Sequence, residues 1–175
     1  MNLRVVTDAY EPGSTFKVLT TSMALESGVL TGSSKIEVPA QVKVGDDYVS
    51  DDDGRGETMS MTLREILRRS SNVGAALVGE AVGADDFADY LTDFGIGSST
   101  GIDFPGEVTG MVTAREDYSG ASVGAMSFGQ AISIPPVQLA RAVAAVANGG
   151  VANTPHFLMA KGGESVVWSD GATEI

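Results

Sequence analysis

The sequence predicts a mixed α/β (α+β) fold in which helices dominate. Five stretches carry helical patterns, in which apolar residues recur at three- and four-residue spacing or lie between a helix start and a helix stop. Short runs that alternate apolar and polar residues, as strands do, occur mainly within residues 30–60. With 175 residues and 43% hydrophobic content, the chain is long and apolar enough to form one domain with a core.

The N-terminal part is predicted to form a short extended run, a loop and a helix. The extended run covers residues 3–6, and the loop contains Glu-Pro-Gly at residues 11–13. The helix follows because apolar residues share one face and Gly28 stands where a helix would end. That apolar face consists of Phe16, Leu19 and Met23. Ser14 is therefore expected at the N-terminus of this helix.

Residues 30–60 are predicted to form loops and short strands. Residues 36–38 and 42–44 alternate in polarity, and we expect them to pair as a hairpin. The acidic stretch at 46–54 ends in a glycine, as a calcium-binding loop requires, but Val49 stands at the first ligand position. We therefore predict a solvated loop and no metal site here.

Four further helices are predicted downstream. Thr62 and Glu65 have the spacing of a capping box, so the first of these helices begins there. Glycines mark the ends of the other three, which are expected over residues 73–82, 85–94 and 135–147. Residues 95–130 are Gly-rich and are expected to be irregular. Residues from 151 onward, including 166–168, are expected to be extended.

Composition excludes several kinds of function. The chain has 11 basic and 23 acidic residues and a formal charge of −12, so its surface repels nucleic acids and anionic membranes. It has no cysteine, which excludes disulfides, thiolate nucleophiles and cysteine-bound zinc. His156 is the only histidine, so a multi-histidine metal site is impossible and a Ser-His-Asp triad would have to use it. Acyl-transfer chemistry is therefore expected to use a lysine or a carboxylate as base, with no metal and no cofactor.

Ser14 and Lys17 are the first candidate pair for such chemistry. Two residues three apart on a helix share one face, with about 5–6 Å between their Cβ atoms, so the amine can reach the hydroxyl. The helix N-terminus offers free backbone N–H groups beside a developing oxyanion. Burial and neighbouring cations lower the pKa of a lysine and allow it to act as a base. The alternative is that Ser14 is a helix cap and Lys17 is solvated.

Four segments together resemble one family. Residues 11–17 read Glu-Pro-Gly-Ser-Thr-Phe-Lys, similar to the nucleophile motif of class B (monofunctional) penicillin-binding transpeptidases. Residues 70–74, Ser-Ser-Asn-Val-Gly, resemble the S-x-N motif of that family. Residues 101–107 and 138–140 are similar to further family segments, in the same order along the chain. The resemblance implies a penicillin-binding transpeptidase / serine β-lactamase-like fold, here a helix-dominated fragment with an incomplete central sheet.

The resemblance also implies roles for the site residues. Ser14 would attack a D-alanyl-D-alanine stem peptide of peptidoglycan, Lys17 would take the serine proton, and Ser70 would relay a proton toward the leaving amine. Asn72 would bind Lys17 and the substrate, since its amide both donates and accepts hydrogen bonds. A β-lactam would acylate the same serine. The alternative for Ser70 and Asn72 is helix capping alone.

One family motif has no counterpart. The family carries a Lys-Thr-Gly strand, and the nearest imitation here is Lys161-Gly162-Gly163. We expect residues 1–175 to be a partial transpeptidase domain, with that strand and an N-terminal anchor module lying outside the chain. Because the strand would supply an oxyanion donor, we expect this fragment to acylate poorly, by about 10²–10³-fold if one donor is lost.

The remaining expectations concern context and alternatives. The resemblance implies a parent protein anchored at the extracytoplasmic face of the bacterial cell membrane, partnered by a membrane-embedded glycan polymerase; it does not separate division from elongation. Runner-up functions are a serine β-lactamase or β-lactam sensor, for which Glu107 or Asp103 could supply a base, and an inactive binding domain of the same fold.

Overall fold

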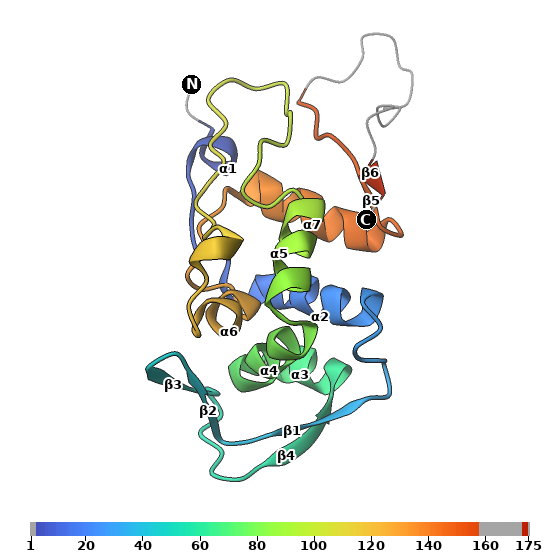
Figure 1. Cartoon of the computed structure of the whole chain (residues 1–175). Helices are drawn as coiled ribbons and strands as arrows, with labels where there is room; N and C mark the ends of the chain where they lie inside the picture. Colours follow the sequence, from blue (N-terminus) through green and yellow to red (C-terminus); the bar gives the residue numbers. More distant parts are fainter. Residues whose placement is uncertain (1–2, 158–172, 175) are drawn as a thin grey trace. The chain divides into compact units, whose positions relative to one another are not determined.

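The computed structural model describes residues 3–157 and 173–174, and contacts divide the chain into two compact units. The first unit comprises Met1–Tyr10, Leu91–Val112 and Ser133–Ile175. The second comprises Glu11–Tyr90 and Thr113–Ile132. The elements of each are labelled in Figure 1, and each unit is described by itself.

Helices are the main regular structure of the second unit. A 3₁₀ turn, Gly13–Phe16, leads into α2 (Lys17–Glu26), and Gly28 has a φ of +70° just beyond the helix end. The other helices are α3 (Leu63–Arg69), α4 (Asn72–Val82), α6 (Ser122–Ser127) and the first part of α5 (Ala84–Asp93), and a 3₁₀ turn covers Arg115–Asp117. The helices predicted from residues 14, 62, 73 and 85 are confirmed, whereas α6 lies in a stretch that was expected to be irregular.

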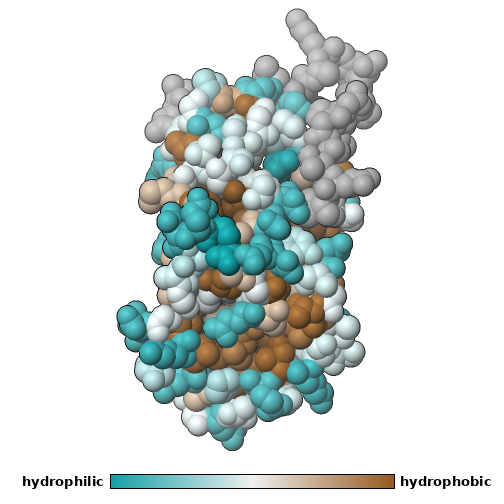
Figure 2. Space-filling model, viewed as in Figure 1, coloured by the Kyte–Doolittle hydropathy of each residue, from teal (hydrophilic) through white to brown (hydrophobic). Residues whose placement is uncertain are grey.

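Helix α4 is the centre of this unit. It packs against both α2 and α6, and its residues are almost all Val, Ala, Leu or Gly. Gly79 allows α6 to approach closely, because a Cβ there would lie 1.8 Å from the Ser127 hydroxyl oxygen. The space-filling view shows a hydrophobic patch over α3 and α4 on one face (Figure 2). Because α4 is apolar on nearly all sides, its burial between α2 and α6 follows from its sequence.

Four short strands pair antiparallel in the second unit. Strand β1 (Lys35–Val38) pairs with β4 (Met59–Thr62), and β2 (Gln41–Val44) pairs with β3 (Asp47–Ser50). The prediction that residues 36–38 and 42–44 pair with each other is wrong, although both segments are strands.

The turn residues explain the observed pairing. Two-residue hairpins favour positive φ, which Gly45 adopts at +64° between β2 and β3. Pro39, in the link between β1 and β2, is fixed at negative φ and cannot adopt such a turn. The partner of β1 therefore comes from further along the chain.

The first unit contains α1 (Arg4–Thr7), α7 (Pro136–Ala147) and the strand pair β5 (Val151–Ala152) and β6 (Thr173–Glu174). The predicted extended run at residues 3–6 is wrong, because this segment forms the helical turn α1. The backbone N–H groups of Val6 and Thr7 donate to the Leu3 carbonyl and close the turn. Helix α7 begins at Pro136 and ends before Asn148, as predicted.

Gln138 of α7 organises the irregular, Gly-rich segment of this unit. Its side chain is 1% exposed; it accepts from the Gly97 N–H and donates to the carbonyls of Ser98 and Thr109, at 2.7–3.0 Å. This one buried amide therefore supplies partners for three backbone groups of a loop that forms no helix or strand. The expectation of irregular structure is confirmed for residues 95–112.

The described elements form a helix-rich mixed α and β structure, which confirms the predicted fold class. Strands within the described residues occur as three separate two-stranded pairs. The described helices are all too short or too polar to cross a bilayer. Residues 166–168 and Lys161, on which two expectations fall, lie outside the described residues.

Candidate active site

Ser14 and Lys17 meet at the start of α2, as the sequence predicts. Ser14 lies in the 3₁₀ turn, and Lys17 is the first residue of the α-helix. The Lys17 Nζ lies 3.1 Å from the Ser14 Oγ. The Thr15 hydroxyl donates to the Pro12 carbonyl at 2.6 Å and closes the turn around the serine. Ser14 is exposed while Lys17 is 1% exposed, so an accessible hydroxyl faces a buried amine.

Ser70 and Asn72 join this pair from a distant part of the chain. The Lys17 Nζ lies 2.6 Å from the Ser70 carbonyl oxygen, 2.7 Å from the Asn72 Oδ1 and 3.1 Å from the Ser70 Oγ. The Ser70 Oγ lies 2.9 Å from the Ser14 Oγ. All four residues belong to the second unit, and the structure brings together all four predicted site residues.

The contacts of Lys17 suit a neutral amine that accepts a proton. A carbonyl and an amide oxygen are acceptors only, and they are the two nearest partners of Nζ. These two oxygens can accept hydrogen bonds from both N–H groups of a neutral amine. The nitrogen lone pair is then left for the Ser14 hydroxyl at 3.1 Å, because the Ser70 hydroxyl donates to the Ser14 Oγ at 2.9 Å. The Ser14 proton has a base within direct reach.

The turn at residues 70–72 joins α3 to α4 and carries both helix caps and site residues. Ser70 has φ +56° and ψ +37°, a left-handed conformation that is uncommon for serine. Ser71 is the N-cap of α4, and its hydroxyl accepts from the Gly74 N–H at 2.8 Å. Ser70 is the C-cap of α3 and also contacts Lys17, whereas Ser71, not Asn72, is the N-cap of α4. Capping alone therefore does not account for the contacts of Ser70 and Asn72 with Lys17.

Burial is the main influence on the charge of Lys17. It lowers the pKa of Lys17 from 10.5 to about 8, while the nearby carboxylates of Asp51 and Asp52 act in the opposite direction. Burial was expected to act together with neighbouring cations, but the charges that act on this amine are the carboxylates of Asp51 and Asp52. At pH 7, a pKa of about 8 leaves about a tenth of the amine neutral.

Asp51 is a site neighbour that sequence reasoning missed. The prediction of a solvated loop is wrong at this residue, whose side chain is 6% exposed. Its carboxylate accepts from the Ser71 hydroxyl at 2.6 Å and the Val73 N–H at 3.0 Å, and it pairs with Arg55 at 2.6 Å. Burial alone would raise the pKa of Asp51, but these hydrogen bonds and the arginine hold it below its usual range. An arginine four residues after Asp51 was the available signal.

The remaining candidates lie in the first unit. Glu107 accepts from the Ser99 hydroxyl and from both the hydroxyl and the N–H of Thr100. Burial raises the pKa of Glu107, but these hydrogen bonds outweigh it and lower the pKa. Asp103 accepts from the Phe157 N–H. Both carboxylates therefore have structural partners within their own unit.

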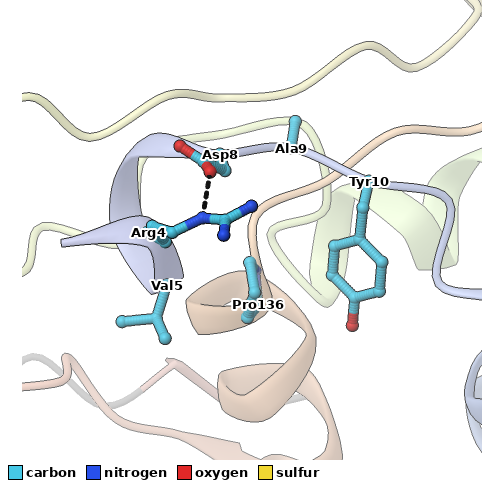
Figure 3. Close-up of a pocket in the computed structure, with 6 residues that line it drawn as sticks. All are labelled: Arg4, Val5, Asp8, Ala9, Tyr10 and Pro136. Atoms are coloured by element: carbon cyan, nitrogen blue, oxygen red, sulfur yellow. Dashed lines mark hydrogen bonds and ion pairs between the residues drawn. The ribbon is translucent and has the colours of Figure 1, made fainter. Parts of the chain in front are cut away.

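A pocket of the first unit carries no comparable chemistry. It has a volume of about 710 Å³ and is lined by Arg4, Val5, Asp8, Ala9, Tyr10 and Pro136 (Figure 3). Arg4 and Asp8 form an exposed ion pair at 2.7 Å. The lining contains no serine, lysine or histidine. Within the described residues, no group of three or more His, Asp or Glu side chains could hold a metal ion.

A serine at the start of a helix, held against a buried lysine amine, defines a serine–lysine acyl-transfer type of site. Residues 1–170 match the family model of the penicillin binding protein transpeptidase domain. The chain belongs to this family, and the resemblance drawn from its motifs is confirmed.

Similar proteins agree with this assignment. A crystal structure from Atopobium parvulum, provisionally named a peptidoglycan glycosyltransferase, is 46% identical with a TM-score of 0.92, covering 99% of this chain and 41% of that chain. Penicillin binding protein 3 of Mycobacterium tuberculosis, complexed with aztreonam, is 31% identical with a TM-score of 0.83, covering 87% and 34%. The peptidoglycan D,D-transpeptidase FtsI of Escherichia coli is 30% identical over 151 residues, 86% of this chain and 25% of the relative. The chain spans about a quarter of the length of the curated relatives it matches.

Proposed function

We propose that the protein containing this chain is a serine-type D-Ala-D-Ala transpeptidase that crosslinks peptidoglycan stem peptides through a Ser14 acyl-enzyme. One observation carries the proposal. The buried Lys17 amine lies within 3.1 Å of the Ser14 hydroxyl, and its two nearest partners are pure acceptors that leave its lone pair for that hydroxyl. The curated E. coli relative is named a peptidoglycan D,D-transpeptidase, which supports the same reaction class.

The reaction proceeds in two acyl transfers. The Ser14 Oγ attacks the carbonyl of the penultimate D-alanine while Lys17 takes the hydroxyl proton. The C–N bond to the last D-alanine then breaks, and a proton returns to that amine through the Ser70 hydroxyl, 2.9 Å from Ser14. An amine of a neighbouring stem peptide attacks the ester, forms the crosslinking amide and releases Ser14. Asn72 holds Lys17 and orients the substrate peptide.

β-Lactams fit the same site as substrate mimics. The Mycobacterium tuberculosis relative is described in complex with aztreonam, a member of this class. In this chain the strained ring amide would be opened by Ser14, so the leaving amine stays tethered to the acyl group. The amine cannot diffuse away, and the adduct persists.

The β-lactamase alternative requires a base that activates water for deacylation. The two carboxylates considered for that role have structural partners: Glu107 accepts from Ser99 and Thr100, and Asp103 accepts from the Phe157 N–H. The Asp51 carboxylate is bound by Ser71, Val73 and Arg55. An inactive binding domain would have no need for a buried lysine among three polar partners. The described residues therefore favour the transpeptidase.

The setting of the reaction follows from its substrate. Peptidoglycan is assembled outside the cytoplasmic membrane, so we place the parent protein at the extracytoplasmic face, anchored to the membrane. A membrane-embedded glycan polymerase is the expected partner, because it would supply the strands to be crosslinked.

The test is acylation of the full-length gene product by a fluorescent penicillin, followed by denaturing electrophoresis and peptide mapping. We expect one label per molecule on Ser14, lost in Ser14→Ala and reduced at least 10³-fold in Lys17→Met. Ser22→Ala is the matched control, because Ser22 lies on the same helix and, among the described residues, its hydroxyl donates to the Val18 carbonyl and not to a site residue. A label on another residue would disprove the proposal, and rapid hydrolysis of nitrocefin would favour the β-lactamase.

A further inference from the structure

Asp51 binds the same turn that carries two of the site residues. We propose that Asp51, with Arg55 as its counter-ion, is a positioning residue that fixes the 70–73 turn so that Ser70 and Asn72 meet Lys17. The proposal rests on the proposed function, because the positioned groups are those of the acylation site.

Alternate residues of the turn bind different charged groups. Ser70 and Asn72 contact the Lys17 amine at 2.6–3.1 Å. Ser71 and Val73 donate to the Asp51 carboxylate at 2.6 and 3.0 Å. The left-handed conformation of Ser70 has a conformational cost, so the turn needs such external contacts to persist. The Lys17 amine and the Asp51 carboxylate provide these contacts.

Arg55 makes a buried carboxylate tolerable at this place. Its side chain is 8% exposed, its Nη1 lies 2.6 Å from Asp51, and its Nη2 donates to the Pro39 carbonyl at 3.0 Å. A buried carboxylate without a partner would be expelled or protonated. The Asp51 carboxylate still raises the pKa of Lys17 and so favours the protonated amine.

The charges around Lys17 can be assigned by element. Of the helices packed against α2, α3 carries charged side chains at residues 64, 65, 68 and 69, and α4 carries Glu80. The charges that raise the pKa of Lys17 come instead from the segment after β3, namely Asp51 and Asp52. Asp52 is exposed and makes no hydrogen bond to the described residues of the 70–73 turn. Asp52 acts on Lys17 by charge alone, whereas Asp51 acts by charge and also holds the 70–73 turn through hydrogen bonds.

This difference provides matched variants. Asp51→Asn removes the charge and one acceptor, Asp51→Glu keeps the charge but moves the carboxylate by one methylene, and Asp52→Asn removes a charge without touching the turn. Acylation of the full-length protein by fluorescent penicillin is measured from pH 6 to 10.5, and thermal unfolding confirms that each variant is folded. The Lys17 amine is titrated separately by NMR in ¹³C-lysine-labelled protein, and its signal is assigned by its absence in Lys17→Met.

We expect the plateau rate at high pH, where Lys17 is neutral in every variant, to fall about 100-fold in Asp51→Asn and Asp51→Glu. In Asp52→Asn the plateau is unchanged, and the midpoint and the Lys17 titration move to lower pH. A wild-type plateau in folded Asp51→Asn or Asp51→Glu would overturn this inference while leaving the proposed function intact. If Asp51→Asn does not fold, Asp51→Glu decides. Failure of the wild-type protein to label on Ser14 would instead overturn the proposed function.

Discussion

Replacing Asn72 with Asp would test whether Lys17 acts as the base. The two side chains have nearly the same shape, and the Asn72 Oδ1 lies 2.7 Å from the Lys17 Nζ. The substitution therefore places a carboxylate in direct contact with the amine. A carboxylate at this distance stabilises the protonated form, so the pKa of Lys17 must rise.

The size of the effect follows from the starting pKa of about 8. An opposite charge in contact shifts a pKa by about 1–3, which places that of Lys17 in Asn72→Asp at about 9–11. The neutral fraction at pH 7 falls from about one tenth to between about one hundredth and one ten-thousandth. Acylation at pH 7 should fall by about 10–1,000-fold from this cause alone.

The pH dependence separates this cause from lost substrate contacts. Acylation of the full-length protein by a fluorescent penicillin is measured between pH 6 and 10.5. The rate of the wild-type protein should rise with pH through a midpoint near 8, because deprotonation creates the base. In Asn72→Asp the midpoint should move up, so the deficit shrinks as pH rises. Asn72→Ala is the control, since it loses the amide contacts without adding charge.

An unchanged midpoint in Asn72→Asp would refute the reasoning. It would mean that the acylation rate does not depend on the protonation of Lys17. A deficit of equal size at every pH would show that Asn72 contributes only substrate binding.

Three further predictions concern stability, each measured by urea unfolding. Gly129→Ala should lower the free energy of unfolding by about 2–4 kcal/mol, because φ is +80° and a Cβ would lie 2.1 Å from the Gly13 carbonyl oxygen. Gly28→Ala, where φ is +70° but the space is open, should lower it by only about 1–2 kcal/mol. Equal costs would contradict the steric argument. Thr62→Ala should lower stability by about 1 kcal/mol through loss of the capping box, and an unchanged midpoint would argue against it. Gln138→Leu should cost about 2–4 kcal/mol, because it leaves one N–H and two carbonyls of the irregular loop without their partner, and a neutral result would mean that water replaces the amide.

The sequence alone determined the features that depend on neighbours along the chain. Thr62 with Glu65 predicted the start of one helix and Pro136 that of another, and glycines predicted helix ends. The serine and lysine of the nucleophile motif were readable from their three-residue spacing, since helical geometry places such residues together. The four clustered residues were likewise named in advance, because their motifs resemble those of a family.

Tertiary structure alone decided which strands pair, how deeply Lys17 is buried and what Asp51 does. Alternation of polarity predicts strands, but it does not show that β2 pairs with β3 or that β1 pairs with the more distant β4. The contacts of Lys17 join residues 53 and 55 positions away, and those of Asp51 reach 20 and 22 positions. In sequence, Asp51 looks like any acidic loop residue, and Lys17 looks like a surface lysine. Their pKa and their partners depend on the side chains that packing places around them, and the order of residues does not specify that environment.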